Sequence, residues 1–310
     1  TIQSHIFATM KKTVLFIINP ISGDIKKANL PDVINKHLDK NQYEHTIKYS
    51  EHAGHATHLA KHAAEQQFDI VVAVGGDGSI NEISQALVNT KTTLAIIAMG
   101  SGNGLATHLK LPIRNAKKAI DLLNNSKEVV IDVGATNYGS FVSCAGLGLE
   151  AMAARVYRHH SIRGFFSYFL AVTKSVLFIY RSKKNEISFI IDGKHRKEKL
   201  YLFTIFNSSY FGYDQGFAPL ASLTDGYFDL VFVKGLPAWK IPILIVLGLL
   251  KKVHLLKESE FHKVKKIEIA AGNKRIAQLD GDSFIASHKF TIEIKEKALK
   301  ILIHKDLNKI

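Results

Sequence analysis

The first 130 residues alternate between short apolar runs and amphipathic segments. Apolar runs without a polar face are typical of strands that are buried on both sides of a parallel sheet. Alternating strands and helices imply right-handed crossovers, which place such strands side by side in parallel. Strands are predicted at 14–18, 45–49, 70–74 and 94–98, and helices at 30–38 and 54–67. The first half of the chain is therefore predicted to be an α/β domain with a parallel sheet.

The pattern changes from about Val129 onward to short strands with period-two alternation and turns between them. Such spacing predicts an antiparallel β-sandwich. Two helical segments interrupt it: 164–180 is rich in aromatic residues, and 238–256 carries a tryptophan, a continuous apolar run and a lysine pair. Each is interpreted either as a core helix or as a helix at a membrane interface. We predict domains at 10–130 and 131–310, with the last strand or helix free to return to the first domain.

Residues 71–84 (VVAVGGDGSINEIS) lead from an apolar strand straight into a glycine-rich turn and a helix start. Gly75, Gly76 and Gly78 let the backbone turn sharply and approach a ligand. The amide groups at such a helix start favour an anion. A carboxylate beside an anion site is unfavourable unless it faces a metal ion or takes a proton. Asp77 therefore indicates chemistry rather than packing.

Three loops are expected to meet at one edge of the parallel sheet, because ligands bind beyond the carboxyl ends of such strands. These loops follow Ile18, Val74 and Ala98. The backbone amides at 75–78 and 100–104 are predicted to cradle phosphate groups.

The composition adds an anionic partner to this picture. The formal net charge is +14, whereas the hydrophobic fraction of 46% and the charged fraction of 22% are ordinary for a folded protein. No basic stretch carries a nucleic-acid-binding signature, so we expect a nucleotide or an acidic membrane surface and no nucleic acid. The alternative is a solvated basic surface that aids solubility. Cys144 is the sole cysteine, which suits a reducing cytoplasm. The longest apolar run, 241–250, is about half of a membrane span, so membrane contact is expected to be peripheral.

Several motifs follow one another in order along most of the chain. They are NPISG (19–23), VVAVGGDGSINE (71–82), GSGNGLA (100–106), GLGLEA (146–151), GYDQGFAPLASLTDGYFDL (212–230) and LDGD (279–282). Together they resemble the diacylglycerol kinase catalytic-domain superfamily, which includes bacterial lipid kinases, sphingosine kinases and ceramide kinases. The resemblance implies a nucleotide-binding domain like that of phosphofructokinases and NAD kinases, then a β-sandwich, with ATP in the cleft between them. It also implies transfer of the γ-phosphate to a primary hydroxyl of a lipid.

The resemblance further implies roles for individual residues. Asp280 matches the aspartate proposed as base in the bacterial lipid kinases, and Asp77 matches the one proposed in sphingosine kinases, so either could be the base. Glu150 falls where an acidic residue contacts the lipid head group in sphingosine kinases. The nucleotide-binding loops match Asn19, Gly75, Gly76, Asp77, Gly78, Ser79, Glu82, Gly100, Ser101, Gly102 and Asn103. The magnesium site matches Asp225 with the backbone carbonyls of Ser222 and Tyr227, and Asp282 is a further candidate metal ligand.

Two departures from the family pattern leave the substrate and the activity open. The third loop reads GSGNG, closer to sphingosine and ceramide kinases than to the GTxND of many bacterial diacylglycerol kinases, and Asp282 replaces the glutamate of a DGE motif. Three hypotheses remain: a lipid kinase that uses ATP and Mg²⁺ at the cytoplasmic membrane surface, a soluble NAD kinase-like enzyme, or a non-catalytic lipid- or nucleotide-binding regulator. The oligomeric state also stays open, with a homodimer as one option.

Overall fold

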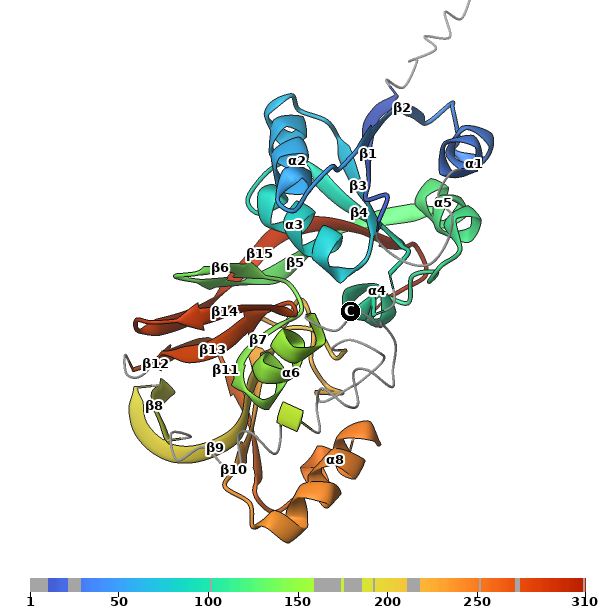
Figure 1. The fold of residues 1–310 in the computed structure, drawn as a ribbon. Coiled ribbons are helices and arrows are strands. Elements are labelled where there is room, and N and C mark those ends of the chain that lie inside the picture. Colours follow the sequence, from blue (N-terminus) through green and yellow to red (C-terminus); the bar gives the residue numbers. More distant parts are fainter. Residues whose placement is uncertain are drawn as a thin grey trace, which may run out of the picture.

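The computed structural model describes residues 11–21, 29–100, 102–158, 174–175, 186–191, 193–210, 218–250, 252–270, 274–308 and 310 of the chain. Figure 1 shows one half with helices on both sides of a sheet and a second half built mainly of strands. All strands in these described ranges belong to one continuous hydrogen-bonded network. The predicted fold class, a parallel α/β domain followed by an antiparallel sandwich, is confirmed.

The α/β half follows the predicted alternation of strands and helices. Its elements are β1 (Lys12–Ile18), α1 (Leu30–His37), β2 (Tyr43–Tyr49), α2 (His55–Glu65), β3 (Ile70–Gly75), α3 (Asp77–Leu87), β4 (Thr93–Ala98), α4 (Gly104–His108) and α5 (Ala116–Asn124). The strands lie in the order β2, β1, β3, β4 and are parallel. Their carboxyl ends therefore share one edge of the sheet.

Helices cover both faces of this sheet, so successive residues of β1 are buried on opposite sides. Leu15 and Ile17 belong to the cluster that includes residues of α2 and α3. Val14, Phe16 and Ile18 belong to the cluster that includes residues of α1 and α5. A strand covered on both faces has no polar side, which is why β1 and β3 read as continuous apolar runs.

The second half is an antiparallel sandwich. Its elements are β5 (Ser126–Thr136), β6 (Gly139–Phe141), β7 (Cys144–Gly148), α6 (Leu149–Arg158), β8 (Glu186–Ile191), β9 (Lys194–Phe206), β10 (Phe228–Lys234), β11 (Ser259–Val264), β12 (Lys266–Ile269), β13 (Arg275–Leu279), β14 (Asp282–Ala286) and β15 (Phe290–His304). Period-two alternation brings one face of each strand into a core rich in phenylalanine, with Phe141, Phe189, Phe203, Phe228, Phe232 and Phe290 all buried. Strand β11 was not predicted, because its sequence SEFHKV has only two apolar residues.

Strand β15 runs through both halves. Its first part pairs with β12 in the sandwich, and its second part lies parallel to β4, with Ile301 opposite Leu94. Along its length it is antiparallel to β5, with a register shift between Lys295 and Leu299. The predicted boundary at residue 130 falls inside β5, so the domain boundaries stay a prediction. The two halves are connected by shared strands rather than by a single linker.

The segment 238–256, predicted as one helix, is broken into three parts: the 3-10 turn η2 (Ala238–Lys240), α8 (Ile241–Leu249) and the 3-10 turn η3 (Val253–Leu255). Ile241 and Leu244 pack with Val231 and Val233 of β10, so one face of α8 covers the outside of the sandwich. The other face is exposed. The core-helix interpretation therefore holds for one face only.

The other predicted helical segment, 164–180, lies almost entirely outside the described residues. Among the helices that the structure does describe, none combines the length and the hydropathy needed to cross a bilayer.

Candidate active site

The three predicted loops meet at the carboxyl ends of β1, β3 and β4. The amide of Asn19 donates to the carbonyl of Val74 (3.0 Å), and the Asn19 side-chain amide donates to the hydroxyl of Ser79 (3.0 Å). The amide of Met99 donates to the carbonyl of Gly75 (2.7 Å). Hydrogen bonds thus join the loop after β1 to the start of α3, and the loop after β3 to the loop after β4.

The glycine-rich loops after β3 and β4 touch through their backbones. A Cβ on Gly100 would lie 2.5 Å from the Cα of Gly76, so no other residue fits at position 100 unless the loops separate. Asn103 fixes the second loop from within, because its side chain accepts from the amide of Gly100 (3.0 Å) and donates to the carbonyl of Gly100 (2.7 Å). The two loops form one rigid unit rather than two independent turns.

Asp77 joins the same two loops through its carboxylate. Its two oxygens accept from the backbone amides of Asn103 (2.7 Å) and Gly104 (2.8 Å). Burial raises the pKa of Asp77, although these hydrogen bonds act in the opposite direction. Asp77 therefore uses two of the amides that the sequence predicted for phosphate binding, and it holds the loop after β4 in place.

The start of α3 keeps the features of an anion site. Gly76, the N-cap residue of α3, has no side chain that could cap the helix, so the amides of the first turn can bind an anion. A Cβ on Gly78 would meet no heavy atom within 4 Å, so the space beside this glycine is open to a bound group. The part of the predicted cradle at 75–78 thus has the room and the donors that a phosphate needs.

Asp280 lies on the opposite side, in the hairpin turn between β13 and β14. Leu279 pairs with Asp282, which leaves Asp280 and Gly281 as a two-residue turn with φ values of 48° and 88°. Two positive φ values are required by the type I′ turn, and Asp-Gly is a sequence that favours it. The turn therefore fixes the Asp280 backbone in a conformation that few residues other than Asp, Asn and Gly adopt readily.

The carboxylate of Asp280 is held by three backbone amides. Its Oδ1 accepts from Ser143 (2.7 Å) and Cys144 (2.9 Å), and its Oδ2 accepts from Val142 (2.7 Å). A carboxylate oxygen has two lone pairs, so among the described residues Oδ2 keeps one for a proton. Burial raises the pKa of Asp280, the three amides lower it and the charge of Asp77 raises it, which together bring this pKa from 3.8 to about 6. The structure thus brings Asp77 and Asp280 together from the two halves of the chain.

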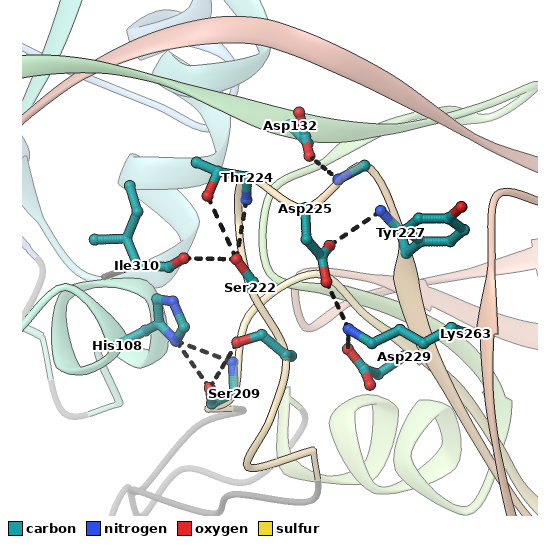
Figure 2. A network of polar contacts seen from close by, with 12 residues as sticks. His108, Asp132, Ser209, Ser222, Thr224, Asp225, Tyr227, Asp229, Lys263 and Ile310 are labelled. Carbon is teal, nitrogen blue, oxygen red and sulfur yellow. Dashed lines mark hydrogen bonds and ion pairs between the residues drawn. The ribbon is translucent and has the colours of Figure 1, made fainter. Parts of the chain in front are cut away.

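The loop before β10 contains the predicted magnesium ligands, and here the cation is a lysine (Figure 2). The Asp225 carboxylate accepts from the Lys263 ammonium at Oδ2 (2.7 Å) and from the Tyr227 amide at Oδ1 (3.0 Å). Lys263 also contacts Asp229 (2.8 Å), and the Ser222 hydroxyl donates to the carbonyl of Ile310 (2.7 Å). Burial lowers the pKa of Lys263, but the two carboxylates outweigh it and raise the pKa overall. As arranged, the Asp225 carboxylate pairs with an ammonium group, and the magnesium site predicted from the sequence stays a prediction.

Replacing Lys263 by methionine is expected to lower the melting temperature by about 2–4 °C, because an ion pair of about 1 kcal/mol is lost and two carboxylates are left facing each other. Millimolar Mg²⁺ should then raise the melting temperature of Lys263→Met but not of the wild type. Thermal unfolding with and without Mg²⁺ measures both effects.

The matched control is Lys265→Met, because Lys265 pairs with Glu296 (2.7 Å) and not with Asp225. It should gain no response to Mg²⁺. A wild-type shift with Mg²⁺ that Asp225→Ala abolishes would contradict this expectation and would support the magnesium site predicted from the sequence.

The remaining predicted site residues are placed as follows. Gly102 precedes Asn103, which is the residue before α4. Glu82 is half-buried on α3, and its backbone carbonyl accepts a hydrogen bond from the Thr57 hydroxyl (3.1 Å). Glu150 is in the first turn of α6, and Asp282 is exposed at the start of β14. Ser101 lies outside the described residues. In the described part of the chain no three His, Cys, Asp or Glu residues gather as a metal site, so the roles of Glu150 and Asp282 stay predictions.

Two family models match the chain in succession. Residues 13–136 match the model described as diacylglycerol kinase catalytic domain, and residues 143–303 match the model described as YegS C-terminal NAD kinase beta sandwich-like domain. The diacylglycerol kinase of Bacillus subtilis (strain 168) is 30% identical over 277 residues, which cover 87% of this chain and 90% of that protein. The chain belongs to the diacylglycerol kinase catalytic-domain superfamily. The family predicted from the motifs is thereby confirmed.

Solved structures support the fold of this superfamily member. A diacylglycerol kinase from Bacillus anthracis str. Sterne matches with a TM-score of 0.70 at 18% identity and covers 97% of this chain and 99% of that chain. An NAD kinase from Archaeoglobus fulgidus, solved in complex with ATP, matches with a TM-score of 0.52 at 15% identity, covering 94% of each chain. At these sequence identities the similarity shows the fold alone. The predicted similarity of fold to NAD kinases is confirmed.

Sequence reasoning missed several residues that hold this superfamily site together. The imidazole Nδ1 of His108, at the end of α4, accepts from the amide of Ser209 in the sandwich (3.1 Å), and burial lowers the pKa of His108 to about 4. The side chain of Asn207 donates to the carbonyls of Asp132 and Val142 (both 2.8 Å). In the sequence, such residues stand out only as polar residues among apolar neighbours. This pattern does not reveal which distant group each side chain bonds.

Proposed function

We propose that this chain is an ATP-dependent lipid kinase that transfers the γ-phosphate to a primary hydroxyl, with diacylglycerol as the first candidate substrate and a sphingoid-type lipid as the second. The observation that carries the proposal is the pair Asp77 and Asp280, one beside the glycine-rich loops and one on the sandwich, with the pKa of Asp280 raised to about 6. Diacylglycerol is placed first because the relative that is 30% identical carries that name.

The α/β half would bind the nucleotide. The glycine N-cap of α3 and the open space beside Gly78 support a phosphate position at this helix start. Asp77 holds the amides of Asn103 and Gly104, so its role in this proposal is to position the loop after β4. Pre-positioned phosphates are the main requirement of phosphoryl transfer, since the protein does little covalent work in that reaction.

Asp280 would act as the general base. The hydroxyl proton would go to Oδ2, the oxygen that accepts one hydrogen bond among the described residues, while Oδ1 accepts two. A base whose pKa lies near the working pH combines the ionised form at neutral pH with adequate basicity. Each Asp77 oxygen accepts one hydrogen bond from the neighbouring loop, so the proposal assigns Asp77 to positioning that loop and assigns the proton to Asp280.

Magnesium ions carried with ATP would neutralise the phosphate charges during transfer, as in other kinases. Asp282 is the candidate ligand closest in sequence to Asp280. The net charge of +14 supports a working place at an anionic membrane surface on the cytoplasmic side, where a lipid substrate would be available.

The test is a phosphate-transfer assay with labelled ATP and three acceptors: diacylglycerol and sphingosine in mixed micelles, and NAD in solution. We expect a labelled phospholipid product with diacylglycerol and no labelled NADP. The matched inactive control is Asp280→Asn.

Other outcomes would overturn the proposal in distinct ways. Label in NADP would support the NAD kinase-like alternative. ATP binding without transfer to any of the acceptors would support the regulator alternative. Label in sphingosine alone would keep the lipid kinase and change its substrate.

A further inference from the structure

Helix α8 has no polar residue in its sequence IPILIVLGL. A helix that is apolar all round is expected to be buried on all sides. The described residues cover one side: Ile241 and Leu244 are buried against the outer face of the sandwich, and Ile245 and Leu247 pack partly against the same cluster. The opposite side has no covering element among the described residues.

The exposed side is a regular stripe of large apolar residues. Ile243 and Val246 lie three residues apart on α8, and Leu250 directly follows the helix with its amide bonded to the carbonyl of Val246 (3.0 Å). Trp239 lies in η2, directly before α8. The exposed fractions of Trp239, Ile243, Val246 and Leu250 are 67%, 41%, 52% and 58%, and Leu255 in η3 adds a further side chain that is 61% exposed. We call these five residues the α8 face. Contiguous apolar patches of this kind mark interaction sites rather than ordinary surface.

The charges around the α8 face are of one sign. Residues 235–257 contain four lysines and one histidine but no aspartate or glutamate. Lys252, His254 and Lys257 are exposed, whereas Lys240 is paired with Glu258. The acidic residues that follow are neutralised too, since Glu260 pairs with Arg196 and Lys234. An apolar stripe with a positive border complements a surface of anionic lipid head groups above acyl chains.

We propose that the α8 face docks this protein on an anionic lipid bilayer, with the helix lying in the plane of the interface. This inference rests on the proposed function, because a kinase for a membrane lipid has to meet its substrate at a bilayer. Trp239 lies at one end of α8 with the Lys240 ammonium 5.3 Å from its ring centre, an arrangement suited to the boundary between head groups and acyl chains. Figure 1 shows α8 at the end of the sandwich farthest from α1 and α2, so docking here leaves the α/β half in the aqueous phase.

A second copy of this chain is the competing occupant. In a symmetric pair each α8 face would meet its own copy, and the exposed lysines of both copies would approach each other. The stretch 235–257 offers no acidic residue to pair with them. Like charges brought together in this way oppose the pairing, whereas an anionic bilayer meets the same lysines with opposite charge.

Trp239 provides a direct readout, because it is the only tryptophan in the chain. The full chain is mixed with vesicles of phosphatidylglycerol and phosphatidylcholine, without ATP or diacylglycerol. We expect a blue shift of the tryptophan emission, quenching by lipids with brominated acyl chains, and weaker binding in high salt or on pure phosphatidylcholine. Co-sedimentation without any change in tryptophan emission would overturn the proposal, because another surface would then be the one that docks.

The matched variants are Val246→Glu on the α8 face and Val130→Glu on β5, where the valine is also exposed (37%) but outside this face. We expect about tenfold weaker vesicle binding for Val246→Glu, and binding within about twofold of the wild type for Val130→Glu. Equal binding by both variants would overturn the proposal. A second result would also overturn it. Sedimentation velocity would show that the wild type is a dimer and that Val246→Glu is a monomer, and the wild type would not bind vesicles.

A short-chain diacylglycerol that dissolves in water separates this inference from the proposed function. Val246→Glu should phosphorylate it as fast as the wild type, because α8 carries no residue of the site. Vesicle binding by a chain with no kinase activity would leave the docking surface standing and remove the proposed function. Kinase activity on the soluble lipid without vesicle binding would keep the proposed function and remove the docking surface.

Discussion

Replacing Asp280 by asparagine is expected to lower kcat for lipid phosphorylation by about two to four orders of magnitude, the usual cost of losing a general base. Asparagine has nearly the same size but cannot take the hydroxyl proton. Binding of ATP should persist, because the glycine-rich loops belong to the α/β half. The measurement is the transfer rate at saturating ATP, and a rate within about threefold of the wild type would show that Asp280 is not the base.

The same substitution has a structural cost that has to be measured alongside. Three backbone amides donate to the Asp280 carboxylate, and an asparagine side chain presents an NH₂ group to at least one of them. A buried donor without an acceptor costs about 1–3 kcal/mol, so a moderate loss of unfolding free energy is expected. Retained ATP affinity and a cooperative unfolding transition would show that the loss of rate comes from chemistry rather than from misfolding.

The pH profile gives an independent check on Asp280. Because the pKa of Asp280 is raised to about 6 and the base acts in its ionised form, kcat/KM should fall as the pH drops through about 6. This acidic limb should be missing from the residual activity of Asp280→Asn. A limb that persists in the variant would indicate that a different group carries the proton.

Gly100→Ala is expected to abolish nucleotide binding and to destabilise the α/β half. The new Cβ would lie 2.5 Å from the Cα of Gly76, which is a backbone atom, so no side-chain rotation can relieve this contact. Overpacking of this kind costs about 1–3 kcal/mol. Separating the loops would also strain the hydrogen bonds from Asn103 and Gly104 to Asp77. Thermal unfolding and ATP titration measure the two effects.

Gly78→Ala is the matched variant, because a Cβ at that position would meet no heavy atom within 4 Å. We expect an unchanged melting temperature together with weaker ATP binding, since the added methyl would enter the space assigned to phosphate. Equal ATP affinity in Gly78→Ala and the wild type would place the phosphates elsewhere. Equal stability of Gly100→Ala and the wild type would show that the loops adapt more than their contact suggests.

The sequence predicted the elements and loops whose features are local. The apolar runs at β1, β3 and β4 gave the parallel sheet, because a strand covered on both faces has no polar side. The convergence of three loops followed from parallel strands alone. The glycines could be found in advance because two backbones that approach closely leave no room for a Cβ, as at Gly76 and Gly100. Asp77 could be found because a carboxylate beside an anion site needs a chemical explanation.

Contacts between distant segments could not be predicted in the same way. The amides that hold Asp280 come from Val142 to Cys144, and they reach it only because β13 pairs with β7 in a register that places Leu279 opposite Ala145. The lysine on Asp225 is 38 residues away along the chain, on β11. The apolar run of α8 allowed both a core helix and a helix at a membrane interface, because a sequence without polar residues does not say which face is covered.

The route of β15 has a consequence for how this chain folds during synthesis. Strand β4 pairs with β3 on one side and with β15 on the other, and Leu299, Ile301 and Ile303 of β15 are part of the α/β core. Until these residues have left the ribosome, one edge of the parallel sheet stays open to pairing with other chains. Domains usually fold one after another from the N-terminus. In this chain the α/β half has to wait for the sandwich, so both halves are completed in one late step.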